Sequence, residues 1–193
     1  MTYAARVPPD EQVAALLARG QVDEAATVAL QAHGPAVLGY LARLLGEGDA
    51  REVFCVVAEN AWRGLPGFRF ESALRTWLYR LAWNAASHHL RDPWRRRGEP
   101  LPESAASRLA ASIAGQSQLP GGRREALDAL RSRLTPEEQT LLVLRVDREL
   151  AWSEVAEVLS TGGAPPDPAT LRKRFERLKD RLADLARAEG LLE

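Results

Sequence analysis

The sequence lacks several features that whole classes of protein require. It has one cysteine, Cys55, in 193 residues, so no disulfide can form within the chain and no zinc site can be built on paired cysteines. No apolar run approaches the roughly 20 residues that a membrane-spanning helix needs. No basic segment followed by an apolar stretch marks a secretory signal. These absences predict a cytoplasmic protein with no metal or other cofactor.

Aromatic residues are also scarce, at 6% of the chain, although hydrophobic residues as a class reach 46%. Alanine and leucine dominate that class, which favours packed helices over a β-sandwich rich in Val, Ile and Thr. We therefore expect an all-α fold, with two helical domains joined by a flexible linker.

Net charge is absent as well, because 26 basic residues balance 26 acidic ones. The charges are unevenly distributed along the chain. Residues 1–62 contain four arginines and eight acidic residues, a net charge of −4, whereas residues 63–97 contain eight arginines and two acidic residues, a net charge of +6. A basic block inside a neutral chain predicts a surface that meets phosphate groups.

Turn and cap signals divide the first half of the chain. Two short helices are expected over 10–33, and Gly34-Pro35 is predicted to start another. Asp49 is predicted to cap a further helix, and the helix after that is expected from about Ser72 to Leu90. Few large apolar residues occur between 98 and 122, a composition typical of a flexible tether. The predicted parts are an N-terminal helical extension (1–33), a first domain (34–97), a linker (98–122) and a second domain (123–193).

The second domain carries a helix-turn-helix pattern. Thr135 and Glu138 have the spacing of a capping box, with proline at the first helical position. A short amphipathic helix is predicted over 151–159, then a turn rich in glycine and proline, then a helix capped by Asp167 that reaches about Ala188. This arrangement is typical of a reader of the DNA major groove.

The helix expected from about Ser72 to Leu90 carries two stripes of residues on different sides. One is apolar and is predicted to be core: Leu74, Trp77, Leu78, Leu81 and Ala85. The other combines guanidinium, indole and amide groups, which suit phosphates, unstacked bases and base edges: Arg80, Trp83, Asn84, Ser87 and Arg91. From periodicity alone, the second stripe is equally compatible with a solvated polar face bearing one exposed tryptophan.

The last helix shows a similar division. Its apolar stripe comprises Leu171, Phe175, Leu178, Leu182 and Leu185, and residues 169–182 contain six basic and two acidic residues, a net charge of +4. An exposed basic face on the second helix of such a pair suits phosphate contacts and arginine reading of guanine. A solvated basic helix or a coiled-coil flank is the alternative.

Catalytic groups are hard to find. His88 and His89 are adjacent, so on a helix they point about 100° apart and cannot chelate one metal. His88 lies toward the apolar edge, where a packed histidine is the ordinary case. Cys55 lies beside core residues and is expected to be a buried, inert thiol. We therefore predict no enzymatic activity, and the alternative, a nucleic-acid-processing enzyme using these three side chains, has little support.

Five segments of the chain resemble the extracytoplasmic-function group of bacterial RNA polymerase sigma factors. Three resemble parts of the group's second conserved region: residues 49–54 and 61–68 (DAREVF and AWRGLPGF) resemble its polymerase-docking part, and residues 70–84 (FESALRTWLYRLAWN) resemble its promoter-melting segment. The other two, residues 134–139 (LTPEEQ) and 150–159 (LAWSEVAEVL), look like its fourth region. The resemblance covers nearly the whole chain.

The resemblance implies a transcription-initiation subunit whose partners are core RNA polymerase (β′ clamp helices and β flap), promoter DNA and an anti-sigma factor. It assigns 34–97 to region two and 123–193 to region four. The implied polymerase-docking residues are Glu52, Val53, Val56, Glu59, Asn60 and Arg63. The implied −10 DNA contacts are Phe68, Arg69, Phe70, Glu71, Ser72, Arg80, Trp83, Asn84, Ser87 and Arg91, and the −35 contacts are Thr170, Lys173, Arg174, Arg177 and Arg181.

Some positions depart from the group's pattern. Cys55 and Val56 stand where Gln and Glu are common on the docking helix, and the turn at 160–167 is longer than usual. The resemblance also places Trp77 against melted DNA, whereas its periodicity places it in the core, where we expect it. Because positions 55 and 56 differ from the group's pattern, a stand-alone helix-turn-helix regulator that no longer docks on polymerase is the competing interpretation.

Overall fold

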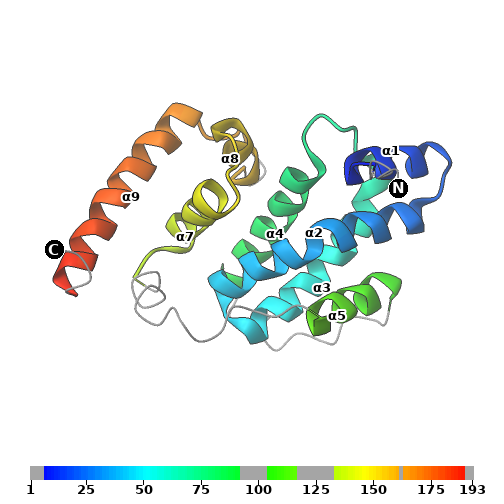
Figure 1. Cartoon of the computed structure of the whole chain (residues 1–193), viewed down its shortest axis with the longest axis horizontal. Helices are drawn as coiled ribbons and strands as arrows, with labels where there is room; N and C mark the ends of the chain where they lie inside the picture. Colours follow the sequence, from blue (N-terminus) through cyan, green and yellow to red (C-terminus); the bar gives the residue numbers. More distant parts are fainter. Residues whose placement is uncertain (1–6, 92–103, 117–132, 161–162, 190–193) are drawn as a thin grey trace, which may run out of the picture. The chain divides into compact units, whose positions relative to one another are not determined.

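The fold is described here from a computed structural model, which covers residues 7–91, 104–116, 133–160 and 163–189 (Figure 1). Every regular element in these ranges is helical, which confirms the predicted fold class. The chain separates into two compact units, Met1–Gln118 and Leu119–Glu193. Within the described ranges, no helix is both long and apolar enough to cross a membrane.

The first unit is built around one long helix, α2. Its elements are α1 (Pro9–Ala18), α2 (Val22–Leu45), α3 (Glu47–Gly64), the short 3-10 helix η1 (Leu65–Gly67), α4 (Leu74–Arg91) and α5 (Ala105–Gln116). Helix α2 packs against α1, α3, α4 and α5 (Figure 1). The Tyr40 ring on α2 meets the Tyr79 ring on α4 edge to face, with centroids 5.6 Å apart. This bundle holds α4 against α2.

The prediction that Gly34-Pro35 starts a helix is wrong, because α2 continues through both residues. A proline inside a helix costs about 3 kcal/mol. Burial of Leu30, Val37, Leu38 and Leu41 on either side offsets that cost. The proposed boundary between 33 and 34 therefore falls in the middle of a packed helix, so the N-terminal extension is not a separate structural part.

Asp49 does not cap a helix either. Helix α3 begins at Glu47, after Gly46, whose φ of +82° belongs to the left-handed region that favours glycine. Asp49 lies in the first turn, and its Oδ2 is 3.0 Å from Nε2 of His89 on α4. The carboxylate thus joins two helices instead of starting one.

The prediction of a structureless linker over 98–122 is wrong for residues 105–116. They form α5, which packs against α3 and α2. Its buried face is made of small residues and one isoleucine: Ala106, Ala110, Ile113 and Ala114. A β-carbon at Gly34 would lie 3.1 Å from atoms of Ile113 and Phe54, so this glycine allows the close approach of α5. Residues 98–103 and 117–122 lie outside the described residues.

The second unit contains the predicted helix-turn-helix. Its elements are α7 (Pro136–Leu142), the π-helix η3 (Val143–Asp147), α8 (Trp152–Val158) and α9 (Pro168–Ala188). The Thr135–Glu138 capping box at α7 is confirmed, as is the Asp167 cap, whose carboxylate accepts hydrogen bonds from the backbone N–H groups of Ala169 and Thr170. Leu171, on the buried side of α9, is fully covered.

Candidate nucleic-acid and polymerase interface

An aromatic cluster forms where η1 gives way to α4. The ring centroid of Phe68 lies 4.8 Å from that of Phe70 and 4.9 Å from that of Trp77. Phe70 is 38% exposed and has a φ of +57°, a conformation that residues other than glycine rarely adopt. Trp77 is only 7% exposed, so its predicted place in the core is confirmed while its ring still supports the loop. The result is a partly exposed π-surface.

The other predicted residues of this loop lie beside the cluster. Arg69 and Glu71 are exposed, and Ser72 is half-buried. All three belong to the segment 68–73, which connects η1 to α4. The structure therefore brings the five predicted loop residues together at the start of α4.

The mixed stripe on α4 is only partly accessible. Arg91 is exposed, and Arg80 and Asn84 are half-buried. Trp83 and Ser87, predicted to face DNA, are 8% and 7% exposed. The expectation of an exposed indole is wrong because burial on α4 extends well around the helix, to Thr76, Tyr79 and Ala82. Leu81 and Ala85, predicted to be core, are half-buried.

The predicted docking stripe on α3 is also divided by burial. Glu52, Asn60 and Arg63 are exposed, and Val56 is half-buried. Val53 is 3% exposed and Glu59 is 8% exposed, so neither presents its side chain on an open surface. The accessible residues of the predicted docking stripe are therefore Glu52, Val56, Asn60 and Arg63.

Glu59 is covered because the segment leading into α5 binds it. Its Oε1 accepts hydrogen bonds from the hydroxyl groups of Ser104 and Ser107, the second at 3.1 Å. Its Oε2 lies 3.4 Å from the guanidinium of Arg63, one turn further along α3. The sequence signal for this contact was a pair of serines in a segment whose composition is compatible with a helix. Nothing in the sequence indicated that Glu59 is the residue that these serines bind.

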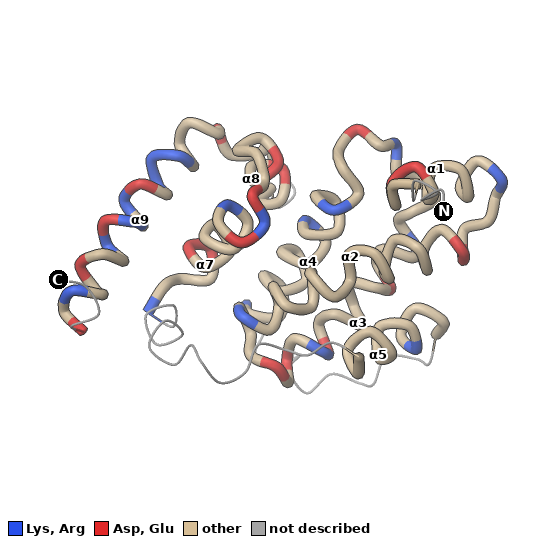
Figure 2. Tube along the Cα trace, in the orientation of Figure 1, with Lys and Arg blue, Asp and Glu red and all other residues tan. Residues whose placement is uncertain are grey.

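The predicted −35 residues share one exposed helix. Thr170, Lys173, Arg174, Arg177 and Arg181 all lie on α9, and all are exposed. Basic positions recur along α9 (Figure 2). Leu171, Phe175 and Leu178 are buried as predicted, whereas Leu182 and Leu185 are half-buried. The helix therefore turns an apolar side inward and leaves its basic residues accessible.

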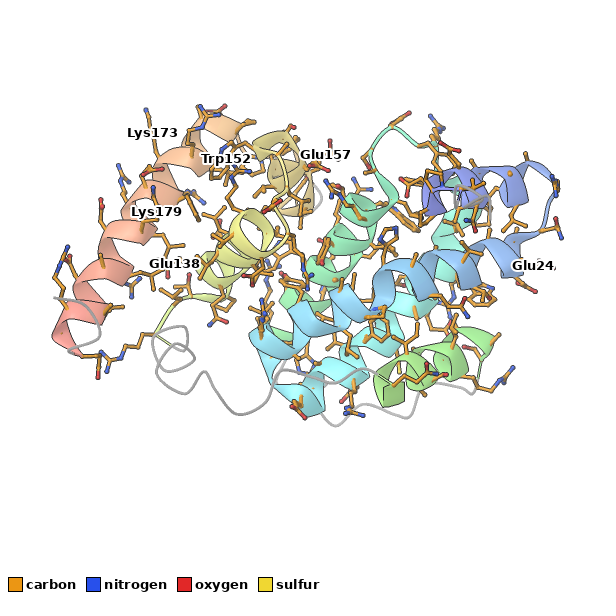
Figure 3. The ribbon with its side chains drawn as sticks, viewed as in Figure 1. Glu24, Glu138, Trp152, Glu157, Lys173 and Lys179 are labelled. Carbon is orange, nitrogen blue, oxygen red and sulfur yellow. The ribbon has the colours of Figure 1, made fainter. Side chains whose placement is uncertain are left out.

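Sequence reasoning missed the acidic neighbours of this basic face. Arg174 Nη1 lies 2.7 Å from Glu137 Oε1, and Arg181 Nη1 lies 2.8 Å from Glu138 Oε1. Figure 3 shows Glu138 between α7 and α9, whereas Lys173 points away from α7. Burial raises the pKa of Glu138, but hydrogen bonds from Thr135 and the charge of Arg181 outweigh it and lower the pKa below its usual value. The carboxylate is therefore ionised at neutral pH.

Comparison with known proteins finds one family that is similar to part of the first unit and several proteins that are similar to most of the chain. Residues 29–96 match the Sigma-70 region 2 family. RNA polymerase sigma factor YlaC of Bacillus subtilis is 30% identical over 127 residues, which are 63% of this chain and 70% of that protein. The chain belongs to the extracytoplasmic-function RNA polymerase sigma factors. The ECF RNA polymerase sigma-E factor of Haemophilus influenzae is 28% identical over 154 residues, 75% of this chain and 78% of that protein. RNA polymerase sigma-H factor of Pseudomonas aeruginosa is 29% identical over 158 residues, 75% of this chain and 77% of that protein.

Membership gives this sigma factor its general role in transcription initiation, with core RNA polymerase and promoter DNA as its partners. The competing interpretation, a stand-alone regulator, rested on the changed positions 55 and 56. Cys55 and Val56 are both half-buried on α3. Glu52, Asn60 and Arg63 on the same helix are exposed.

The remaining chemical candidates of the sigma factor are His88, His89 and Cys55. The prediction that His88 packs is wrong: His88 is exposed, and it is His89 whose side chain is 8% exposed beside Asp49. Burial raises the pKa of the Cys55 thiol, as do the charges of Glu59 and Glu52, which opposes thiolate formation. Among the described residues, no group of three histidine, cysteine or acidic side chains could hold a metal ion.

Proposed function

We propose that the two units divide promoter recognition between them. In this proposal residues 29–96, which match the Sigma-70 region 2 family, act as region two: α3 docks on the β′ clamp helices of core polymerase, and the loop 68–72 with α4 opens the −10 element. Residues 123–193 act as region four, which meets the β flap and reads the −35 element with α9. Linking two weak DNA-binding units on one polymerase raises their effective concentration, so neither needs a large net charge.

The aromatic cluster is the observation that carries this proposal. An unpaired base can stack on an exposed ring, and such stacking is worth about 1–3 kcal/mol per base. Phe70 is exposed next to Phe68, and Trp77 holds Phe68 from inside the fold. Flipping a base out of the duplex costs a few kcal/mol. Stacking on Phe70 supports strand opening by offsetting part of that cost.

The electrostatic arrangement agrees with this division. Arg80 and Asn84 follow the loop on α4 and are half-buried, and in this proposal they contact the strand that leaves the Phe70 ring. Lys173 and Arg177 on α9 are exposed and suit the phosphates of duplex DNA.

We place the protein in the cytoplasm, where bacterial polymerase works, and we propose that an anti-sigma factor holds it inactive. Binding, with no catalytic step of its own, is the proposed mode of action.

Substitutions at Phe70 test the effect of the ring separately from the effect of the backbone conformation. Phe70→Gly removes the ring and relieves the positive φ, which costs other residues about 1–2 kcal/mol, so the fold should be as stable as before or more stable. Permanganate footprinting with core polymerase should then show about a ten-fold loss of −10 opening, in line with the worth of one stacked base. Phe70→Tyr, which keeps a ring, should open normally. Equal opening by Phe70→Gly and the wild type would refute the proposed role of the loop.

A further inference from the structure

Helix α4 begins at Leu74, directly after an alanine. Ala73 precedes the first helical residue, Leu74, and its methyl group cannot accept a hydrogen bond. The first N–H groups of a helix have no partner within the helix, so they need an acceptor from elsewhere. Because Leu74 is 0% exposed, water does not reach this position freely.

The acceptor comes from α1, far away in the sequence. Oδ2 of Asp10 accepts a hydrogen bond of 3.0 Å from the backbone N–H of Leu74. The other oxygen, Oδ1, lies 3.7 Å from Nε2 of His33 on α2. A negative charge is favourable at a helix N-terminus, where the helix dipole is positive. One carboxylate on α1 therefore bonds to the start of α4 and lies beside His33 of α2.

This link lies at one end of the aromatic loop. At the other end, the backbone N–H of Phe68 donates a 3.0 Å hydrogen bond to the carbonyl of Leu65 in η1. Between these two points the chain holds Phe70 at its φ of +57°, which costs free energy and persists only where neighbouring contacts impose it. Losing the Asp10 contact would release the loop at its α4 end, next to the bend that sets the direction of the Phe70 ring.

We propose that Asp10 is a positioning residue for promoter opening, and that α1 serves to carry this carboxylate to the start of α4. Asp10 touches no DNA in this proposal; it fixes the loop 68–73 so that the ring of Phe70 is already oriented when a base leaves the duplex. The inference rests on the proposed role of that loop at the −10 element. It assigns a role to the first helix, for which the sequence pattern alone suggested none.

The same part of the chain offers a matched control. Asp23, on α2, accepts a 3.0 Å hydrogen bond from the indole N–H of Trp62 on α3. Asp10 and Asp23 thus each link helices of the first unit, but only Asp10 bonds to the start of α4. Asp10→Asn supplies the conservative variant, because its side-chain oxygen can still accept the Leu74 hydrogen bond.

The experiment uses the full chain with core polymerase, on a promoter found by run-off transcription of genomic fragments. It measures the affinity for polymerase and the extent of −10 opening for Asp10→Ala, Asp10→Asn, Asp23→Ala and Phe70→Gly. We expect Asp10→Ala to reduce opening about five- to ten-fold, the factor expected for a lost helix cap, with unchanged polymerase affinity. Asp10→Asn should recover most of the opening, and Asp23→Ala should open as the wild type does.

A template with a pre-opened −10 bubble adds a readout that general destabilisation would not move. On that template the defect of Asp10→Ala should shrink to about two-fold, because no base has to be flipped out of a duplex. The inference is overturned if Asp10→Ala matches Asp23→Ala, or if it loses polymerase affinity in parallel with opening. If Phe70→Gly opens normally, the proposed function of the loop fails first, and this inference fails with it.

Discussion

The guanidinium of Arg174 lies 2.7 Å from the carboxylate of Glu137, so the basic face of α9 is partly neutralised by the helix beside it. Both side chains are about half exposed, at 52% and 54%. An exposed ion pair of this kind contributes about 0–1 kcal/mol. It is weak enough for a DNA phosphate to replace the carboxylate. Glu137 therefore acts as a competitor for one of the proposed −35 contacts.

Removing that competitor should strengthen DNA binding. We expect Glu137→Gln to tighten binding of −35 duplex by roughly two- to five-fold, because Arg174 no longer has to leave a carboxylate. Fluorescence anisotropy on labelled duplex measures the change. Glu189→Gln is the control, since Glu189 pairs with Arg133 near the far end of α9. Equal tightening by both variants would mean that net charge alone, and not the Arg174 pair, sets the affinity.

Charge removal on α9 itself should change the salt dependence. Replacing Arg174 and Arg177 with alanine should weaken −35 duplex binding and flatten the plot of log affinity against log salt by about one unit per lost phosphate contact. Titrations at several salt concentrations give the slope. Arg187→Ala serves as the control because Arg187, in the last turn, pairs with Asp184. A slope unchanged by the double substitution would rule out phosphate contacts at these two arginines.

Helix α5 should contribute to the stability of the first unit. Ile113 is 7% exposed and lies next to Gly34, so Ile113→Ala should lower the free energy of unfolding by about 2–4 kcal/mol. Urea denaturation followed by circular dichroism measures it. Gln116→Ala, which removes one exposed hydrogen bond to Ser112, should change little. If Ile113→Ala is as stable as the wild type, α5 is a tether and not part of the bundle.

His33 should make the first unit less stable in mild acid. Burial lowers the pKa of His33, Asp10 raises it and Arg75 lowers it again, and the net result is a pKa below the usual value. The unfolded chain, in which histidine has a pKa of about 6.5, therefore takes up a proton before the folded chain does. Stability is thus complete above that value and decreases as the pH falls through it toward the lower folded pKa. Thermal unfolding between pH 5 and 7.5 should show this decrease in the wild type and a smaller one in His33→Gln, and identical pH profiles would exclude His33 as the cause.

Local signals in the sequence predicted local structure well. The capping box of Thr135 and Glu138 needs only residues three positions apart, and the structure confirms it. Periodicity also placed Trp77, Leu171 and Phe175 correctly, because each lies on the face that packs against the rest of its own unit. Where neighbouring positions decide the conformation, the sequence was sufficient.

The errors share a different physical cause, which is contact between distant segments. Nothing near Pro35 indicates that packing on both sides carries α2 through it. Trp83 was expected on the surface because a helical wheel gives direction but not how far burial extends around the helix. Residues 105–116 are mostly small, which resembles a linker until Gly34 and Phe54 provide a surface that small residues fit. The bond between Asp10 and Leu74 spans 64 positions and leaves no local pattern.

Run-off transcription with purified core polymerase tests most directly whether two helical units of this chain select and open a promoter together. Core polymerase alone should give no defined transcript on genomic fragments, and addition of the full chain should produce transcripts from discrete start sites. Those start sites should share two short sequence elements, near −10 and −35. Absence of any defined transcript, with purified chain that is folded and core polymerase that is active with another sigma factor, would contradict the assignment.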